Sequence, residues 1–383
     1  MSEAFITATA AVLPNAPVDN DAMETVLGQI GGQPSRARRI VLRQNGIETR
    51  HYAIDPATGQ PTHTNASLTA AAIRALGESG FALDDLRCLV AGTSIPDQIM
   101  PGHGVMVHGE LGTPDCEVMT TAGICLSGLT ALKYAWLAVK AGEVANAVAT
   151  GSELCSGVLR AEHFASENAA RVDALEARPW IAFEKDFLRW MLSDGAGAFL
   201  VEPLPRRGQI NLRIDWIDFS SAAHRLPACM YAGGERDAGG SLTGWGRFSP
   251  RDWAEKSIFA IKQDVKLLDR HVVEATLETP LRKLIARRGL QADDIDWFLP
   301  HMSSYYFRQP IADGLARVGL PIPAQRWFTN LASCGNTGAA SIYIMINELR
   351  TSGRLKTGER LLCFVPESGR FSGGFMLLTV VQP

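Results

Sequence analysis

Strand-like runs and helix-like segments alternate along the chain, and this alternation constrains its fold more than any other feature. Such alternation is typical of α/β proteins, in which helices pack on the faces of a sheet. The sequence therefore predicts an α/β fold. In the first half the strand-like runs are 4–14, 86–94, 116–121 and 146–153, and the helix-like segments are 20–32, 65–80, 103–112 and 126–142.

The second half repeats the same rhythm. Its strand-like runs are 209–221, 297–301, 360–368 and 373–382, and a single long helix is predicted over 254–289. A chain of 383 residues is longer than one small core usually organises. We therefore expect two similar halves, residues 1–205 and 206–383, which meet near the proline-containing segment 202–209. That one unit was duplicated is a hypothesis, since the halves share the alternation of strands and helices rather than sequence identity.

Two segments of the first half carry turn and cap signals. Residues 41–53 are expected to form a strand and loop with a tight turn at Asn45-Gly46. The helix over 65–80 is expected to open at Asn65 or Ser67 and to close at a glycine.

Charge and cysteine usage exclude several classes of protein. The formal net charge of −3 gives no electrostatic case for nucleic acid or an anionic membrane. No run of about 18 apolar residues suggests a membrane span, and the N-terminus has no basic segment typical of a secretory signal. The seven cysteines are odd in number, scattered, and without zinc spacing. We expect a reduced, cytoplasmic protein with no metal site.

Cys125 stands where a strand-like run turns into a helix. Gly123 permits a tight turn before it. A helix N-terminus presents unpaired N–H groups and partial positive charge, which can lower a cysteine pKa. From this segment alone, a small residue at a crowded turn and a nucleophile at a helix mouth are equally consistent. The helix that follows has one apolar face, formed by Leu129, Leu132, Trp136 and Val139.

Two further residues bear on the chemistry at Cys125. His301 follows an apolar strand, at the strand end where α/β folds bind ligands. Asn336 lies in the Gly-rich loop 331–338, just before a helix. A lone strand-end histidine is more often structural, and an Asn-Gly turn is commonly an ordinary cap. The three residues in this order are jointly informative.

On these residues the chain resembles the β-ketoacyl-acyl-carrier-protein synthase III group of the thiolase superfamily. The resemblance implies a thiolase-like fold in which two similar halves form five layers, α-β-α-β-α. The nucleophilic cysteine then belongs to the first half, and the histidine and asparagine to the second. The motifs that carry the resemblance, in the family's order, are NGIETRHYA, TTAGICLSGLTAL, LSDGAGAFLVE, DWFLPH, GNTGAAS and the final GGF.

The resemblance also implies roles for individual residues. Cys125 is the acylated nucleophile, and His301 and Asn336 donate hydrogen bonds to the enolate that decarboxylation forms. The backbone N–H of Cys125, with that of Gly373 or Gly374, forms the oxyanion hole. Acyl transfer is then ping-pong through a covalent intermediate, without metal or redox cofactor. The substrates are phosphopantetheine thioesters, on carrier protein or coenzyme A, and the protein is expected to be a homodimer.

The sequence departs from the plain priming enzymes around the predicted substrate entrance. Ile40 and Gln44 occupy the places of the tryptophan and arginine that sandwich the adenine of coenzyme A. This departure favours acyl carrier protein as the thioester carrier. Four basic residues on the predicted long helix are candidates for binding its acidic surface, although a solvated helix face is the simpler interpretation: Lys256, Lys262, Lys266 and Arg270.

Other departures point to a specialised branch. The segment 366–375 carries Glu367 and Arg370, where a polar group beside the sulfur is a candidate acid/base for a second step or a salt-bridge partner. Insertions over 164–191 and 228–253 are expected to reshape the acyl pocket or the dimer contact. The chain is most similar to the ketosynthases that form dialkylresorcinol precursors, which condense and cyclise two acyl or β-ketoacyl thioesters to a cyclohexanedione.

Three other functions stay open at this point. The first is a priming synthase that condenses an acyl starter with malonyl-carrier protein. The second is a cysteine-dependent thioester hydrolase, which would want glycine where Ser127 stands and would leave Asn336 without a role. The third is a non-catalytic ketosynthase-like partner, which would not need all three candidate residues.

Overall fold

The structure is a computed structural model that describes residues 3–35, 38–164, 188–237 and 239–383. Most of the first predicted insertion, 165–187, therefore lies outside the described residues. Within the described ranges, none of the helices is both long and apolar enough to cross a membrane.

One nine-stranded mixed sheet runs through the molecule. Its strand order is β13-β14-β15-β8-β1-β7-β6-β4-β5, and β1 joins the two halves by pairing with β7 on one side and with β8 on the other. The strands are β1 (Phe5–Val12), β4 (Cys88–Thr93), β5 (Glu117–Ala122), β6 (Ala147–Glu153), β7 (Gly195–Glu202), β8 (Asn211–Ser221), β13 (Trp297–Pro300), β14 (Arg360–Glu367) and β15 (Ser372–Val381).

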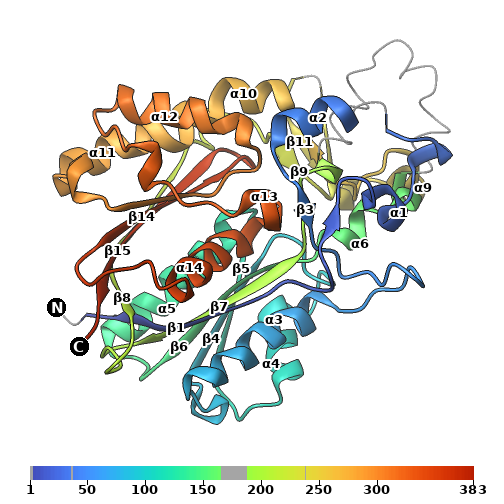
Figure 1. Cartoon of the computed structure of the whole chain (residues 1–383). Coiled ribbons are helices and arrows are strands. Elements are labelled where there is room, and N and C mark those ends of the chain that lie inside the picture. Colours follow the sequence, from blue (N-terminus) through green and yellow to red (C-terminus); the bar gives the residue numbers. More distant parts are fainter. Residues whose placement is uncertain (1–2, 36–37, 165–187, 238) are drawn as a thin grey trace.

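Helices cover both faces of each half of the sheet and give five layers (Figure 1). The middle layer is apolar on both sides because it packs against the two half-sheets at once. This arrangement confirms the predicted fold class. The outer helices of the first half are α3 (Asn65–Ala75) and α4 (His103–Leu111), the middle helices are α5 (Leu126–Ala141) and α14 (Ser341–Thr351), and the outer helices of the second half are α10 (Val265–Val273), α11 (Thr279–Arg288) and α12 (Arg308–Arg317).

The chain passes from the first half to the second between β7 and β8, close to residue 205. Among the described residues, the pairing of Phe5 and Ile6 with β8 is the ladder that joins the two half-sheets. A division into domains at residue 205 stays a prediction.

The predicted single helix over 254–289 is wrong in its first part, where a short helix and a strand precede a continuous helical stretch over 265–288. Ser249 caps α9 (Pro250–Glu255), whose proline at the first turn suits a helix start. The next residues form β12 (Lys262–Gln263), which pairs with β9 (Met230–Tyr231). Asp264 then caps α10 by accepting a hydrogen bond from the backbone N–H of Leu267 at 2.9 Å. A π-helical turn, Glu274–Glu278, links α10 to α11.

The start of the predicted strand and loop over 41–53 is also wrong. Residues there form α2 (Arg38–Asn45), which buries Val41, before β3 (Thr49–Arg50). The turn after Asn45 is present, with Gly46 at a φ of 65° and the Asn45 side chain accepting from the N–H of Ile47. Helix α3 is capped by Thr64, with Ser67 completing the capping box.

Short elements complete the described chain. They are β2 (Val18–Asp19), α1 (Met23–Leu27), α6 (Ser156–Leu159), β10 (Gly234–Arg236), β11 (Leu242–Gly244) and α13 (Leu331–Cys334).

Candidate active site

Cys125 is the N-cap residue of α5 and lies three residues after the end of β5. The side chain lines a pocket that reaches into the second half of the molecule. The structure therefore confirms the predicted position of the cysteine at the mouth of a helix.

His301 directly follows β13 and lies on the same pocket. Its backbone N–H donates to the carbonyl of Phe364 at 2.8 Å, which fixes the residue to the neighbouring strand. Burial lowers the pKa of the imidazole to about 4, so the ring is neutral near pH 7. Nδ1 is buried and has no hydrogen-bond partner among the described residues. A neutral ring can act as a donor to an oxyanion without adding charge to the pocket.

Asn336 is held by the backbone on both sides. Its N–H donates to the carbonyl of Met191 at 2.8 Å, and its own carbonyl accepts from Ser193 at 2.9 Å. The side-chain Oδ1 accepts from the backbone N–H of Gly338 at 3.0 Å. Because Oδ1 is occupied, the amide nitrogen is the group available to a ligand as a donor.

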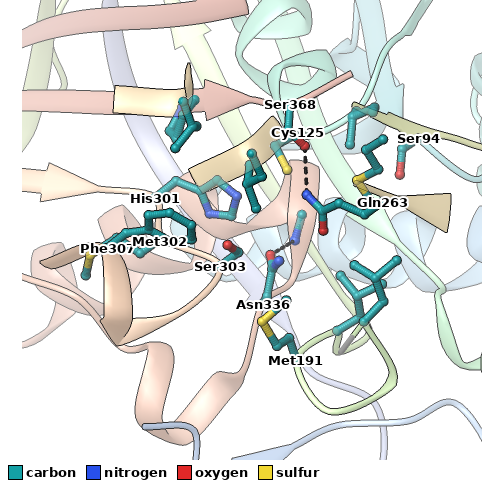
Figure 2. A pocket seen from close by; sticks show the side chains of 18 of the residues that line it. Ser94, Cys125, Met191, Gln263, His301, Met302, Ser303, Phe307, Asn336 and Ser368 are labelled. Carbon is teal, nitrogen blue, oxygen red and sulfur yellow. Dashed lines mark hydrogen bonds between the residues drawn. The ribbon is translucent and has the colours of Figure 1, made fainter. Parts of the chain in front are cut away.

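The three predicted residues meet in one pocket, with His301 and Asn336 directed toward Cys125 (Figure 2). Two hydrogen-bond donors opposite a sulfur nucleophile suit an enolate that attacks an acyl thioester. Their chemical roles remain predictions. Most of the remaining lining is apolar and suits an acyl chain, including Ile95, Ile124, Leu188, Met191, Leu192, Met230, Ile261, Leu268, Val272, Met302, Phe307 and Phe364.

The helix mouth does not lower the pKa of Cys125. Burial raises the pKa of the thiol well above its usual value, and the carboxyl groups of Glu153 and Glu367 raise it further. Glu367 Oε2 accepts from the backbone N–H groups of Ile124 and Leu126 at 2.8 and 3.2 Å. A carboxylate thus occupies donors of the helix start that we expected to favour a thiolate.

Glu367 itself does not line the pocket, although its neighbours Pro366 and Ser368 do. Its carboxyl group turns toward the backbone around Cys125, and burial raises its pKa. A second-step acid/base role for Glu367 stays a prediction. Arg370, the other polar residue singled out in this segment, donates to the carbonyl of Leu226 at 3.0 Å.

Gly374 lies in β15 opposite Val365 and Phe219. A Cβ at this position would fall far inside van der Waals contact with the Leu126 side chain, at the start of α5. Glycine therefore allows β15 to approach the helix that carries Cys125. Its part in an oxyanion hole, like that of Gly373, remains a prediction.

Sequence reasoning missed two polar residues of the pocket. Glu153 ends β6 and accepts from Ser94 Oγ at 2.6 Å and from the N–H of Ala339 at 3.1 Å. Burial raises the pKa of Glu153 to about 7. The signal that could have identified Glu153 is its position at the end of a predicted strand. Gln263 also lines the pocket. It was missed because the sequence predicted one long helix there rather than a strand beside the pocket.

The four basic residues differ in setting. Lys262 forms an ion pair with Glu235 and lies largely buried, and Lys256 pairs with Asp252 at 3.3 Å. Lys266 and Arg270 are exposed on α10, where Lys266 lines a second hollow together with Gln44. Ile40 is exposed on α2. The four residues therefore do not share one helix face.

No cluster of three or more His, Cys, Asp or Glu suited to a metal ion occurs in the part of the chain that the structure describes.

Comparisons with known proteins agree with this architecture. The family "3-Oxoacyl-[acyl-carrier-protein (ACP)] synthase III C terminal" matches residues 285–378. The β-ketoacyl-[acyl-carrier-protein] synthase III of Rhizorhabdus wittichii is 26% identical over 376 residues, covering 98% of each chain. The solved structure of AbyA1, a tetronic acid condensing enzyme, has a TM-score of 0.75 at 22% identity and covers 98% of this chain and 99% of its own. The synthase III of Pseudomonas aeruginosa PAO1 has a TM-score of 0.72 at 20% identity over 99% of each chain.

The chain therefore has the same fold as these solved structures, with a large mixed sheet and helices in layers. The curated relatives that match nearly the whole chain are named β-ketoacyl-[acyl-carrier-protein] synthase III, an acyltransferase-type condensing enzyme, and the chain is similar to them.

Proposed function

We propose that the protein joins two acyl thioesters by decarboxylative Claisen condensation, with Cys125 as the acyl carrier. The observation that supports this most directly is the placement of neutral His301 and the Asn336 amide opposite Cys125 in an apolar pocket. A hydrolase would need an activated water, whereas this pocket is lined mainly by apolar side chains.

The first half-reaction transfers an acyl group to the protein. Cys125 Sγ attacks the thioester carbonyl, a new C–S bond forms, and the carrier leaves as a free thiol. Because the pKa of Cys125 is raised, the thiol is protonated at rest and must lose its proton as it attacks. Neutral His301, whose side chain faces the sulfur, is the available acceptor for that proton.

The second half-reaction forms the C–C bond. With a malonyl-type donor, the carboxylate leaves as CO₂ and its electron pair becomes an enolate. A β-ketoacyl donor has no carboxylate to lose, so its enolate forms when neutral His301 removes the acidic proton at C2. In both cases the enolate oxygen accepts hydrogen bonds from His301 and Asn336. The enolate carbon then attacks the acyl carbonyl on Cys125, and the C–S bond breaks. The released sulfur regains its proton from His301, when His301 has taken the C2 proton of the donor, or from water when the donor has lost CO₂. Both donors are in place before reaction, so little reorganisation is required.

We further propose that the donor is a β-ketoacyl thioester and that the product cyclises to the cyclohexanedione precursor of a dialkylresorcinol. The departures at Ile40, Gln44 and the 366–375 segment support this branch. Condensation of an acyl starter with malonyl-carrier protein is the second candidate, which the names of the curated relatives favour.

An acyl carrier protein is the proposed thioester carrier. The second hollow shares Leu268 and Phe307 with the main pocket and has Lys266 at its rim, which suits an entering phosphopantetheine arm and its phosphate. We also infer a homodimer, because the edge strand β5 is exposed along most of its length.

Product analysis separates the two candidates. Purified enzyme is given an acyl-carrier-protein thioester together with either malonyl or β-ketoacyl thioester, and products are weighed by mass spectrometry. A ring lacking both thiol carriers supports the cyclising reaction, whereas linear extension from malonyl thioester alone contradicts it.

Intact-protein mass spectrometry tests the nucleophile in the same samples. The Cys125→Ala variant should lose the acyl adduct, and Cys116→Ala, which removes a half-buried thiol outside the pocket, should keep it. Persistent acylation of Cys125→Ala would remove this residue from the mechanism.

A further inference from the structure

A hydrogen-bonded pair of polar side chains lies in the pocket wall beside Cys125. Gln263 Nε2 donates to Ser368 Oγ at 3.1 Å, and both side chains line the pocket (Figure 2). Gln263 is only 7% exposed and Ser368 only 9%. Two polar side chains at this depth require an explanation, since a buried polar group without partners costs free energy.

The backbone around the pair is built from three segments that are distant in sequence. Gln263 is paired with Met230 in the β12–β9 ladder. The N–H of Met230 donates to the carbonyl of Ser368 at 3.2 Å, and the N–H of Cys229 donates to that of Gly369 at 2.9 Å. The insertion that carries β9 therefore holds Gln263 and Ser368 against each other, beside the segment that ends at Glu367.

Their hydrogen-bonding capacity is only partly used. A primary amide offers two donors and an acceptor oxygen, and a hydroxyl offers one donor. Among the described residues, no hydrogen bond occupies Gln263 Oε1 or takes the hydroxyl proton of Ser368. Neither Gln263 Oε1 nor Ser368 Oγ is among the fully buried polar atoms that lack a hydrogen-bond partner. Because both residues line the pocket, the unused donors and acceptor are available to a ligand that enters it.

The pocket wall beside Gln263 suits an acyl chain that is apolar except for one polar group. Met230, Leu268 and Val272 line the pocket beside Gln263 and offer no hydrogen bonds through their side chains. A plain alkyl chain against this wall would offer no partner to Gln263 Oε1 or to the hydroxyl proton of Ser368. A chain that carries one oxygen close to its thioester would provide a partner for that proton.

We propose that Gln263, positioned by Ser368, forms a subsite for a second oxygen on the acyl substrate, as in a 3-oxoacyl thioester. This inference rests on the proposed function, since it takes the pocket at Cys125 as the place where the acyl group and the β-ketoacyl donor meet. It makes Gln263 a specificity-determining residue, because substrates with this oxygen gain a hydrogen bond and bind more tightly. Substrates without it leave a buried polar group unpaired and bind more weakly.

Binding in a Cys125→Ala background tests the subsite without requiring either acylation or ring closure. The dissociation constants of 3-oxooctanoyl-pantetheine and octanoyl-pantetheine are compared by titration calorimetry. We expect the 3-oxo ligand to bind about tenfold more tightly. Adding Gln263→Leu should abolish this preference, mainly by weakening the 3-oxo ligand, and adding Ser368→Ala should reduce it.

Gln309→Leu provides the matched control, because Gln309 is exposed and bonds Asp313 on α12 away from the pocket. It should leave the preference unchanged. Equal binding of the two ligands in the Cys125→Ala protein, or a preference that survives Gln263→Leu, would overturn the subsite. Linear products in the turnover assay would contradict cyclisation but not this preference, so the two proposals fail separately.

Discussion

At the scale of single residues, the carboxyl groups around Cys125 set its reactivity. Glu367 accepts from the N–H groups on either side of the cysteine, and Glu153 approaches from the end of β6. His301 adds no positive charge, because burial keeps its pKa near 4. The raised pKa therefore favours the protonated thiol at rest.

Removing the charge of Glu367 should lower the pKa of Cys125. In Glu367→Gln the amide oxygen still accepts from Ile124 and Leu126, but the negative charge that disfavours the thiolate is gone. We expect the pH midpoint of Cys125 alkylation by iodoacetamide to fall by roughly one unit. The Cys125→Ala protein supplies the background from the other cysteines.

Glu359→Gln is the control for this charge change, since Glu359 precedes β14 and bonds Trp297 at the other end of the strand. Its midpoint should match that of the wild type. An unchanged or higher midpoint in Glu367→Gln would show that this carboxyl group does not influence the sulfur.

At the scale of elements, glycines let three segments meet behind the pocket. A Cβ at Gly151 in β6 or at Gly128 in α5 would fall far inside contact with the Ala339 carbonyl. The turn Gly338–Ala340, which follows Asn336, is thus wedged between a strand and a helix. The close approach of these elements positions the Asn336 amide.

Gly151→Ala should push this turn outward. We expect the free energy of unfolding to fall by about 1–3 kcal/mol, because the new methyl group overfills a packed contact. Decarboxylation should slow more than acylation of Cys125, since Asn336 moves while the start of α5 keeps its place. Denaturant titration and the two partial reactions measure these effects.

Gly109→Ala is the matched substitution, because its Cβ would meet no atom within 4 Å on α4. It should be neutral or slightly stabilising. Gly151→Ala and Gly109→Ala could instead have the same free energy of unfolding, with normal decarboxylation in Gly151→Ala. The packing of the turn Gly338–Ala340 between β6 and α5 would then not position Asn336.

At the scale of the whole molecule, the sheet ends in the exposed edge strand β5. Exposed apolar side chains gather on β5 and on the helix packed against it, where Met119 is 38% and Leu137 47% exposed. An unpaired edge with apolar neighbours is a natural place for a second copy to add its own strand. The same strand leads to the turn before Cys125.

Met119→Lys should therefore weaken self-association. We expect the wild type to sediment as a dimer and the variant to shift at least partly to monomer at equal concentration, because a buried unpaired charge is costly. Leu204→Lys, at an exposed site after β7, should leave the dimer intact. A monomeric wild type, or an unaffected Met119→Lys dimer, would contradict this interface.

Several features could be predicted because their signals are local. The period of apolar residues places α5 directly after Cys125, and the apolar run of β13 delivers His301 at its end. Local signals failed over 254–289, where a helical period continues through β12. Pairing with β9, more than thirty residues earlier, overrides that period.

The sequence by itself determined the α/β alternation and the positions of Cys125, His301 and Asn336 at the ends of their elements. Only the tertiary structure decided that they share one pocket, that Glu367 accepts a hydrogen bond from the backbone N–H of Ile124, 243 residues away, and that Gln263 lines the same pocket. The physical reason is that helix and strand periods depend on neighbouring residues. A pKa and a polar subsite depend instead on which distant groups packing brings together.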